Sequence, residues 1–181
     1  DVINLVGQIR RLSEIPLLLM SYYNPIFSYG ESRFIKDCVS SGVDGVIVPD
    51  LPFEEAGSFS FRSLDAGLYN ISFISPLTNG RRLKDIARHA NGFVYYVSLT
   101  GVTGMRKNTD ARLGQKVKSV KKITDIPVCV GFGVSSRVQA RSICNYADGV
   151  IVGSAIVAKI KENINNPSIV KNVGDFVERL I

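Results

Sequence analysis

Short apolar runs alternate with longer segments of helical period along the whole chain. Six such runs occupy residues 15–22, 44–49, 68–75, 92–98, 126–131 and 149–153. Runs such as Gly45-Val46-Ile47-Val48 are continuous rather than alternating between apolar and polar residues. Continuous apolar runs of this length are typical of parallel strands that are buried on both faces. The pattern therefore predicts six strands of a parallel sheet.

Helices are predicted in front of, between and after these strands. The apolar spacing places them at 1–12, 31–41, 54–66, 79–90, 109–123, 135–146, 154–164 and 168–180. Gly42 and Gly67 stand where a helix would end, and Ser135 and Ser136 stand where bare amides need a cap. The expected order is one helix, six strand–helix units and one extra helix.

This alternation predicts a parallel α/β domain that spans residues 1–181 as a single domain. Two architectures fit it, an open doubly wound sheet and a (β/α)₈ barrel. Gly, Asn, Asp and Tyr gather after nearly every predicted strand, where barrel enzymes place their active sites, and this favours the barrel.

The charge, hydropathy and cysteine content restrict what this protein is expected to bind. The net charge is +6, from 22 Lys and Arg against 16 Asp and Glu. The basic residues are scattered and do not interleave with aromatic residues, so nucleic-acid binding is not expected, whereas a small anionic substrate fits the charge. No apolar run approaches the roughly 20 residues that span a bilayer. Cys38, Cys129 and Cys144 are odd in number, lie in apolar patterns and have no metal-site spacing, so they are expected to be reduced thiols.

Three glycine-containing turns in the last third of the chain are typical of phosphate binding. They are Gly101-Val102-Thr103-Gly104, Gly131-Phe132-Gly133 and Gly153-Ser154, each directly after a predicted strand. Glycine lets backbone amides approach a phosphate closely, and a helix N-terminus adds a favourable dipole. Barrel enzymes often hold phosphate in the loops after strands seven and eight. On that count the first run is strand three, only strands 3–8 are present, and about two N-terminal βα units are absent.

Five motifs resemble the tryptophan synthase α family, in its order and with its spacing. The motifs are Tyr23-Asn24-Pro25-Ile26, Val48-Pro49-Asp50-Leu51-Pro52-Phe53-Glu54-Glu55, Gly92-Phe93-Val94-Tyr95 with Ser98-Leu99-Thr100-Gly101-Val102-Thr103-Gly104, Gly131-Phe132-Gly133-Val134-Ser135, and Ala147-Asp148-Gly149-Val150-Ile151-Val152-Gly153-Ser154-Ala155-Ile156-Val157. They extend across essentially the whole chain.

The resemblance implies a phosphate-binding (β/α)₈ TIM barrel and a lyase of tryptophan biosynthesis. The family cleaves indole-3-glycerol phosphate to indole and glyceraldehyde 3-phosphate. Its catalytic Glu follows strand two and its catalytic Asp lies in the next loop, so both are expected in the missing N-terminal part. The resemblance further implies a heterotetramer with a β subunit, which carries pyridoxal phosphate, and no cofactor in this chain.

The resemblance also assigns roles to residues of this chain. Tyr95 is expected to assist catalysis beside the carboxylates. The expected substrate contacts are Tyr22, Pro49, Asp50, Phe93, Thr103 and Phe132, of which Asp50 orders its loop rather than acting as a base. The expected phosphate contacts are Gly104, Gly131, Gly133, Gly153 and Ser154. No metal ligands are expected.

Two other functions remain open from the sequence. Another sugar-phosphate barrel enzyme, such as an isomerase or epimerase, would share the glycine turns but would not require the Pro49-Asp50-Leu51-Pro52 motif together with Gly101–Gly104. A shortened chain could instead be a non-catalytic partner or remnant. The location is expected to be cytoplasmic, with the plastid stroma as the alternative.

Overall fold

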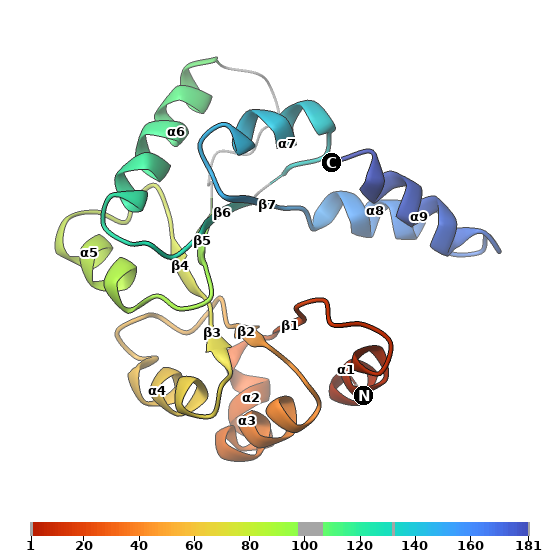
Figure 1. Cartoon of the computed structure of the whole chain (residues 1–181), viewed down its shortest axis with the longest axis horizontal. Helices are drawn as coiled ribbons and strands as arrows, with labels where there is room; N and C mark the ends of the chain where they lie inside the picture. Colours follow the sequence, from red (N-terminus) through yellow and green to blue (C-terminus); the bar gives the residue numbers. More distant parts are fainter. Residues whose placement is uncertain (1, 98–106, 132, 181) are drawn as a thin grey trace. The chain divides into compact units, whose positions relative to one another are not determined.

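The computed structural model describes residues 2–97, 107–131 and 133–180. Contacts between Cα atoms divide the chain into two compact units, one formed by residues up to 73 with 89–93 and the other by residues 74–88 with those from 94 onward. Each unit contains parallel strands and the helices that cover them (Figure 1).

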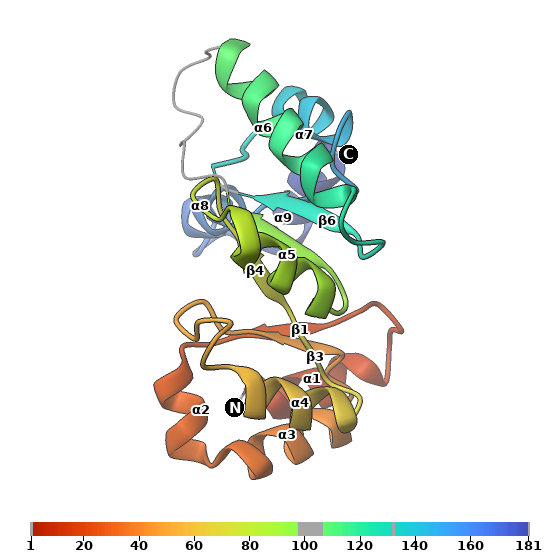
Figure 2. The ribbon, with the colours of Figure 1, turned by 90° about the vertical axis from the view of Figure 1, so that its left-hand side faces the viewer.

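The first unit is a three-stranded parallel sheet with helices on one side. Its elements are α1 (Val2–Arg10), β1 (Leu18–Met20), α2 (Tyr23–Tyr29), α3 (Glu31–Ser40), β2 (Gly45–Ile47), α4 (Gly57–Asp65) and β3 (Tyr69–Asn70). The strand order is β1-β2-β3. In both views α1–α4 lie on the same side of this sheet (Figures 1 and 2). The core between them includes Phe34, Cys38, Val46 and Leu68.

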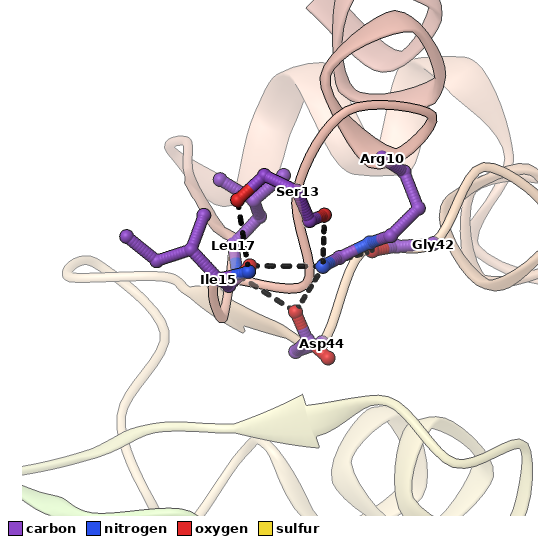
Figure 3. Close-up of polar contacts among 6 residues, drawn as sticks. All are labelled: Arg10, Ser13, Ile15, Leu17, Gly42 and Asp44. Atoms are coloured by element: carbon purple, nitrogen blue, oxygen red, sulfur yellow. Dashed lines mark hydrogen bonds and ion pairs between the residues drawn. The ribbon is translucent and has the colours of Figure 1, made fainter.

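An arginine closes the N-terminal ends of β1 and β2. Arg10, the last residue of α1, donates hydrogen bonds to the carbonyl oxygens of Gly42, Ser13 and Ile15 and pairs with the carboxylate of Asp44 at 2.6 Å (Figure 3). The same carboxylate accepts the Leu17 amide at 2.7 Å. One side chain thus ties α1 to the starts of two adjacent strands.

Gly42 is required by this arrangement. Its φ is +82°, which L side chains rarely adopt, and a Cβ there would lie 2.9 Å from Arg10 Cγ. The expected helix stop at Gly42 is therefore confirmed, and it also makes room for the arginine.

The second unit contains a four-stranded sheet with helices along it. Its elements are β4 (Ser72–Ile74), which crosses the unit boundary after Phe73, α5 (Gly80–His89), β5 (Val94–Val97), α6 (Lys107–Lys121), β6 (Val128–Gly131), α7 (Arg137–Cys144), β7 (Gly149–Ile151), α8 (Ser154–Glu162) and α9 (Ile169–Glu178). The strand order is β4-β5-β6-β7. Figure 1 shows α8 packed against α9 beyond β7.

The second unit repeats the aspartate contact of the first. Asp44 and Asp148 each begin the sequence Asp-Gly-Val-Ile-Val. The Asp148 carboxylate accepts the Val128 amide at 2.9 Å and pairs with Lys121, the last residue of α6. The bond from Lys121 is the main cause that lowers the pKa of Asp148, and the Val128 amide adds to it. The two units thus share one arrangement. A basic residue at the end of a helix pairs with an aspartate, and that aspartate precedes the second strand after the helix.

The predicted elements differ from the structure in three places. The run 68–75 is two strands in different sheets, because Ile71 still donates to Val46 of the first sheet while residues 72–74 join the second. Helix α2 was not predicted, since Asn24-Pro25 resembles a turn. The predicted helix 54–66 begins only at Gly57, because Glu55 and Ala56 donate to the Pro52 carbonyl in a turn.

Burial on both faces of every strand is also not observed within this chain. In β5 the buried Val94 and Tyr96 alternate with the partly exposed Tyr95 and Val97, and no residue of β7 is fully buried. One face of the second sheet is thus packed and the other is only partly covered.

The fold class is a parallel α/β fold, as expected. In each sheet the strands follow sequence order without the reversal that marks a doubly wound sheet, which argues against that alternative. The numbering of the strands as third to eighth stays a prediction. Among the described helices, none is long and apolar enough to cross a membrane.

Replacing Arg10 with Ala should lower the free energy of unfolding by about 2 kcal/mol, because hydrogen bonds to carbonyls at two strand starts are lost together with a partly exposed ion pair. Urea unfolding measures the change. Arg11→Ala is the matched control, since Arg11 is exposed. Equal stability of the two variants would contradict the role given to Arg10.

Candidate functional site

The carboxyl ends of β6 and β7 bring two predicted glycine turns to one edge of the second sheet. Gly131 pairs with Ile151 in the parallel ladder, so Gly133 and Gly153 each lie two residues beyond a paired position. Gly133 has a φ of +67°, which explains its glycine. A Cβ on Gly153 would meet no atom within 4 Å, so crowding within the described chain does not explain the glycine there.

Tyr95 and Gly131 are in direct contact. A Cβ on Gly131 would lie 2.9 Å from the Tyr95 hydroxyl oxygen and 2.7 Å from Cβ of Ile151. Burial raises the pKa of Tyr95, so its phenol is protonated at neutral pH and can donate a hydrogen bond. The structure therefore brings the predicted assisting tyrosine against a predicted phosphate-site glycine.

The helices after these two strands differ at their N-termini. In α7 the Ser136 hydroxyl accepts the Gln139 amide, and the Gln139 side chain accepts the amides of Ser135 and Ser136. In α8 the N-cap residue is Gly153, which has no side chain to cap the first turn, and both Gly153 and Ser154 are exposed. The start of α8 is therefore accessible to an anion.

Three of the four predicted residues of the first unit lie at the carboxyl ends of β1 and β2, whereas Phe93 lies at the amino end of β5. Tyr22 is the N-cap residue of α2 and its side chain is 68% exposed. Pro49 and Asp50 follow β2 and are exposed, and the Asp50 carboxylate accepts the Tyr23 amide at 2.8 Å. Phe93 is partly buried just before β5. This bond joins Asp50 to the start of α2, and the role of Asp50 in ordering its own loop stays a prediction.

The two units therefore hold different parts of the predicted site. The first contains Tyr22, Pro49, Asp50 and Phe93, and the second contains Tyr95, Gly131, Gly133, Gly153 and Ser154. Thr103, Gly104 and Phe132 lie outside the described residues. Within the described ranges, no three His, Cys, Asp or Glu side chains are grouped as metal ligands.

A polar cluster that joins Tyr23 of α2, Glu31 of α3 and Arg62 of α4 was not predicted from the sequence. The Tyr23 hydroxyl donates to Glu31 at 2.7 Å, and Glu31 pairs with Arg62 of α4. This hydrogen bond is the largest cause of both pKa shifts, raising the pKa of Tyr23 and lowering that of Glu31. The eight-residue spacing of Tyr23 and Glu31 across an unpredicted helix left no periodic signal for the pair.

Comparison with known proteins decides the family. The family model described as "Tryptophan synthase alpha chain" matches residues 1–178. The chain belongs to the tryptophan synthase α-chain family. The tryptophan synthase α chain of Geotalea uraniireducens is 43% identical over 179 residues, and that of Geotalea daltonii is 45% identical over 157 residues.

Solved α-chain structures share the fold. The tryptophan synthase α chain of Legionella pneumophila superposes with a TM-score of 0.89 at 37% identity over 99% of this chain. A chain of the tryptophan synthase a2b2 complex of Pyrococcus furiosus gives a TM-score of 0.87 at 37% identity over 98% of this chain. The chain spans 67% and 60% of the two Geotalea relatives, and 67% and 71% of the two structures.

Gly131→Ala should destabilise this α-family chain by about 1–3 kcal/mol, because the added methyl group meets Ile151 and the Tyr95 hydroxyl at less than 3.0 Å. Adding Tyr95→Phe should recover only part of the loss, since the Ile151 contact remains. Thermal or urea unfolding of the two variants measures both steps.

Gly174→Ala is the control, because a Cβ at that α9 position meets no atom within 4 Å. Its stability should equal or exceed the parent's, since alanine is the better helix former. A Gly131→Ala variant as stable as Gly174→Ala would disprove the crowding.

Proposed function

We propose that this chain forms the phosphate- and indole-binding part of a lyase that cleaves indole-3-glycerol phosphate to indole and glyceraldehyde 3-phosphate. Family membership supports this proposal. So does the position of Gly133 and Gly153, which each lie two residues beyond the paired ends of β6 and β7. The chain spans about two thirds of its relatives, so the activity is assigned to the family fold that includes the remaining third.

The reaction is a retro-aldol cleavage. A base removes the proton of the glycerol hydroxyl next to the ring, and that oxygen becomes the aldehyde oxygen. The carbon–carbon bond to indole C3 breaks, and its electron pair passes into the ring system. An acid has protonated C3 beforehand, which places a positive charge on the ring nitrogen. The electron pair of the broken bond neutralises this charge, so indole leaves as a neutral molecule that keeps its N–H proton. General acid–base groups contribute about 10²–10⁴-fold to such steps.

The described residues serve binding and orientation in this scheme. The exposed start of α8, with Gly153 and Ser154, accepts the phosphate through backbone amides and one hydroxyl. Gly131 lacks a side chain and so leaves space for the Tyr95 hydroxyl, and the phenol of Tyr95 is neutral because burial raises its pKa. Tyr22 and Pro49, which follow β1 and β2, supply apolar surface for the indole ring. Phe93 lies at the amino end of β5 and is included by family resemblance alone. Gly104, Thr103 and Phe132 complete the set by family resemblance alone.

The main acid–base carboxylates belong to a family segment that this chain does not match. In this scheme β3 and β4 are two parts of one barrel strand, so β1 to β7 correspond to the third to eighth strands of the barrel. That segment supplies the first two. A β subunit that carries pyridoxal phosphate receives the indole, in keeping with the a2b2 complex from which one of the similar structures comes. We place the reaction in the cytoplasm, where the described free thiols would stay reduced.

Titration with glycerol 3-phosphate tests the phosphate site. Ser154→Ala should weaken binding by about 0.5–1.5 kcal/mol through loss of one hydroxyl bond, and Gly133→Asp should abolish it through charge and steric blockage. Ser168→Ala, at the N-cap of the neighbouring helix α9, is the matched control and should bind like the parent. Equal affinity in all four proteins would refute the site.

An indole-release assay tests the division of labour. The isolated chain should bind the phosphate yet show no measurable cleavage of indole-3-glycerol phosphate, because the proposed scheme assigns the acid–base pair to the remaining third of the family fold. Turnover close to that of a full-length α chain would show that the catalytic groups lie in this chain.

A further inference from the structure

Helix α2 begins without a capping side chain of its own. Its N-cap residue Tyr22 makes no side-chain capping bond, although its backbone is extended as a cap requires. Its third residue is Pro25, which has no amide hydrogen to satisfy. The amides of Tyr23 and Asn24 are therefore the donors in this first turn that need an acceptor from another segment.

Asp50 supplies that acceptor from the neighbouring strand. Met20 and Ile47 are paired at the ends of β1 and β2, and Ser21 extends the ladder by donating to the Ile47 carbonyl. Tyr23 and Asp50 each lie three residues beyond that pair. The parallel register thus brings the Asp50 carboxylate to 2.8 Å from the Tyr23 amide nitrogen. A carboxylate at this position also interacts favourably with the helix dipole.

The ring of Tyr23 is held independently of its backbone. Its hydroxyl donates to Glu31, which pairs with Arg62, and its ring meets Phe59 edge-on at 6.3 Å between centroids. The first residue of α2 is therefore fixed on both its backbone and its side chain. Tyr22 directly precedes it, with its ring exposed.

We infer that Asp50 is a positioning residue, which holds the start of α2 and thereby sets the place of Tyr22 for the aromatic part of the substrate. The inference rests on the proposed function for the role of Tyr22, but the contact between Asp50 and α2 does not. Asp50 acts through the helix and does not touch the ring of the ligand.

Hydrogen exchange tests the contact without any ligand. Asp50→Ala should speed exchange of the α2 amides by roughly fivefold, the factor expected for loss of a helix cap. Asp50→Asn keeps an acceptor oxygen and should restore most of the protection. Glu55→Ala, which removes an exposed carboxylate of the following turn, should leave α2 unchanged. Unaltered exchange in Asp50→Ala would overturn the inference.

Indole binding tests the consequence for Tyr22. The chain contains no tryptophan, so the fluorescence of added indole reports binding directly. Asp50→Ala and Tyr22→Ala should each weaken indole binding several-fold, and the double variant should bind as weakly as Tyr22→Ala alone, because both changes act through one ring.

Additive losses in the double variant would mean that Asp50 contacts the ligand directly, which would refute the positioning role. If the parent protein binds no indole, the aromatic slot of the proposed function fails. The exchange measurement then still decides whether Asp50 holds α2, so the two failures can be told apart.

Discussion

The parallel register of adjacent strands is the constraint on which the rest of the structure depends. In the β1–β2 and β6–β7 pairs it is fixed at the N-terminal ends, where an aspartate before one strand accepts an amide at the start of the other and binds a cation that ends a helix. Once the starts are aligned, the carboxyl ends are aligned as well. Asp50 then meets Tyr23, and the exits at Gly133 and Gly153 leave the sheet together.

The two ends of the strands therefore do different work. The starts carry charged side chains engaged with one another, as at Arg10 and Asp44. The carboxyl ends carry glycines, the exposed ring of Tyr22 and the exposed start of α8. Polar groups satisfied within the chain stabilise it, whereas donors left accessible can bind a ligand.

Much of this could be predicted because it depends on local chemistry. The strand–helix alternation, the helix stop at Gly42 and the serine cap of α7 each follow from residue type and spacing. Helix α2 was missed because Asn24-Pro25 resembles a turn and because the acceptor at its start is Asp50, 27 residues away in sequence, which leaves no local capping signal. The change of sheet at Ile71 was missed for a similar reason, since an apolar run does not reveal which neighbour each residue pairs with.

The recurring Asp-Gly-Val-Ile-Val segment has a consequence for how such a chain can diverge. The segment carries the acid and the glycine, but its cation stands on a different helix and is arginine in one case and lysine in the other. The aspartate thus belongs to the repeated segment, whereas the basic residue that pairs with it belongs to a helix outside the segment. A lineage could duplicate or exchange this segment first and acquire a matching cation afterwards, since either long basic side chain reaches the carboxylate.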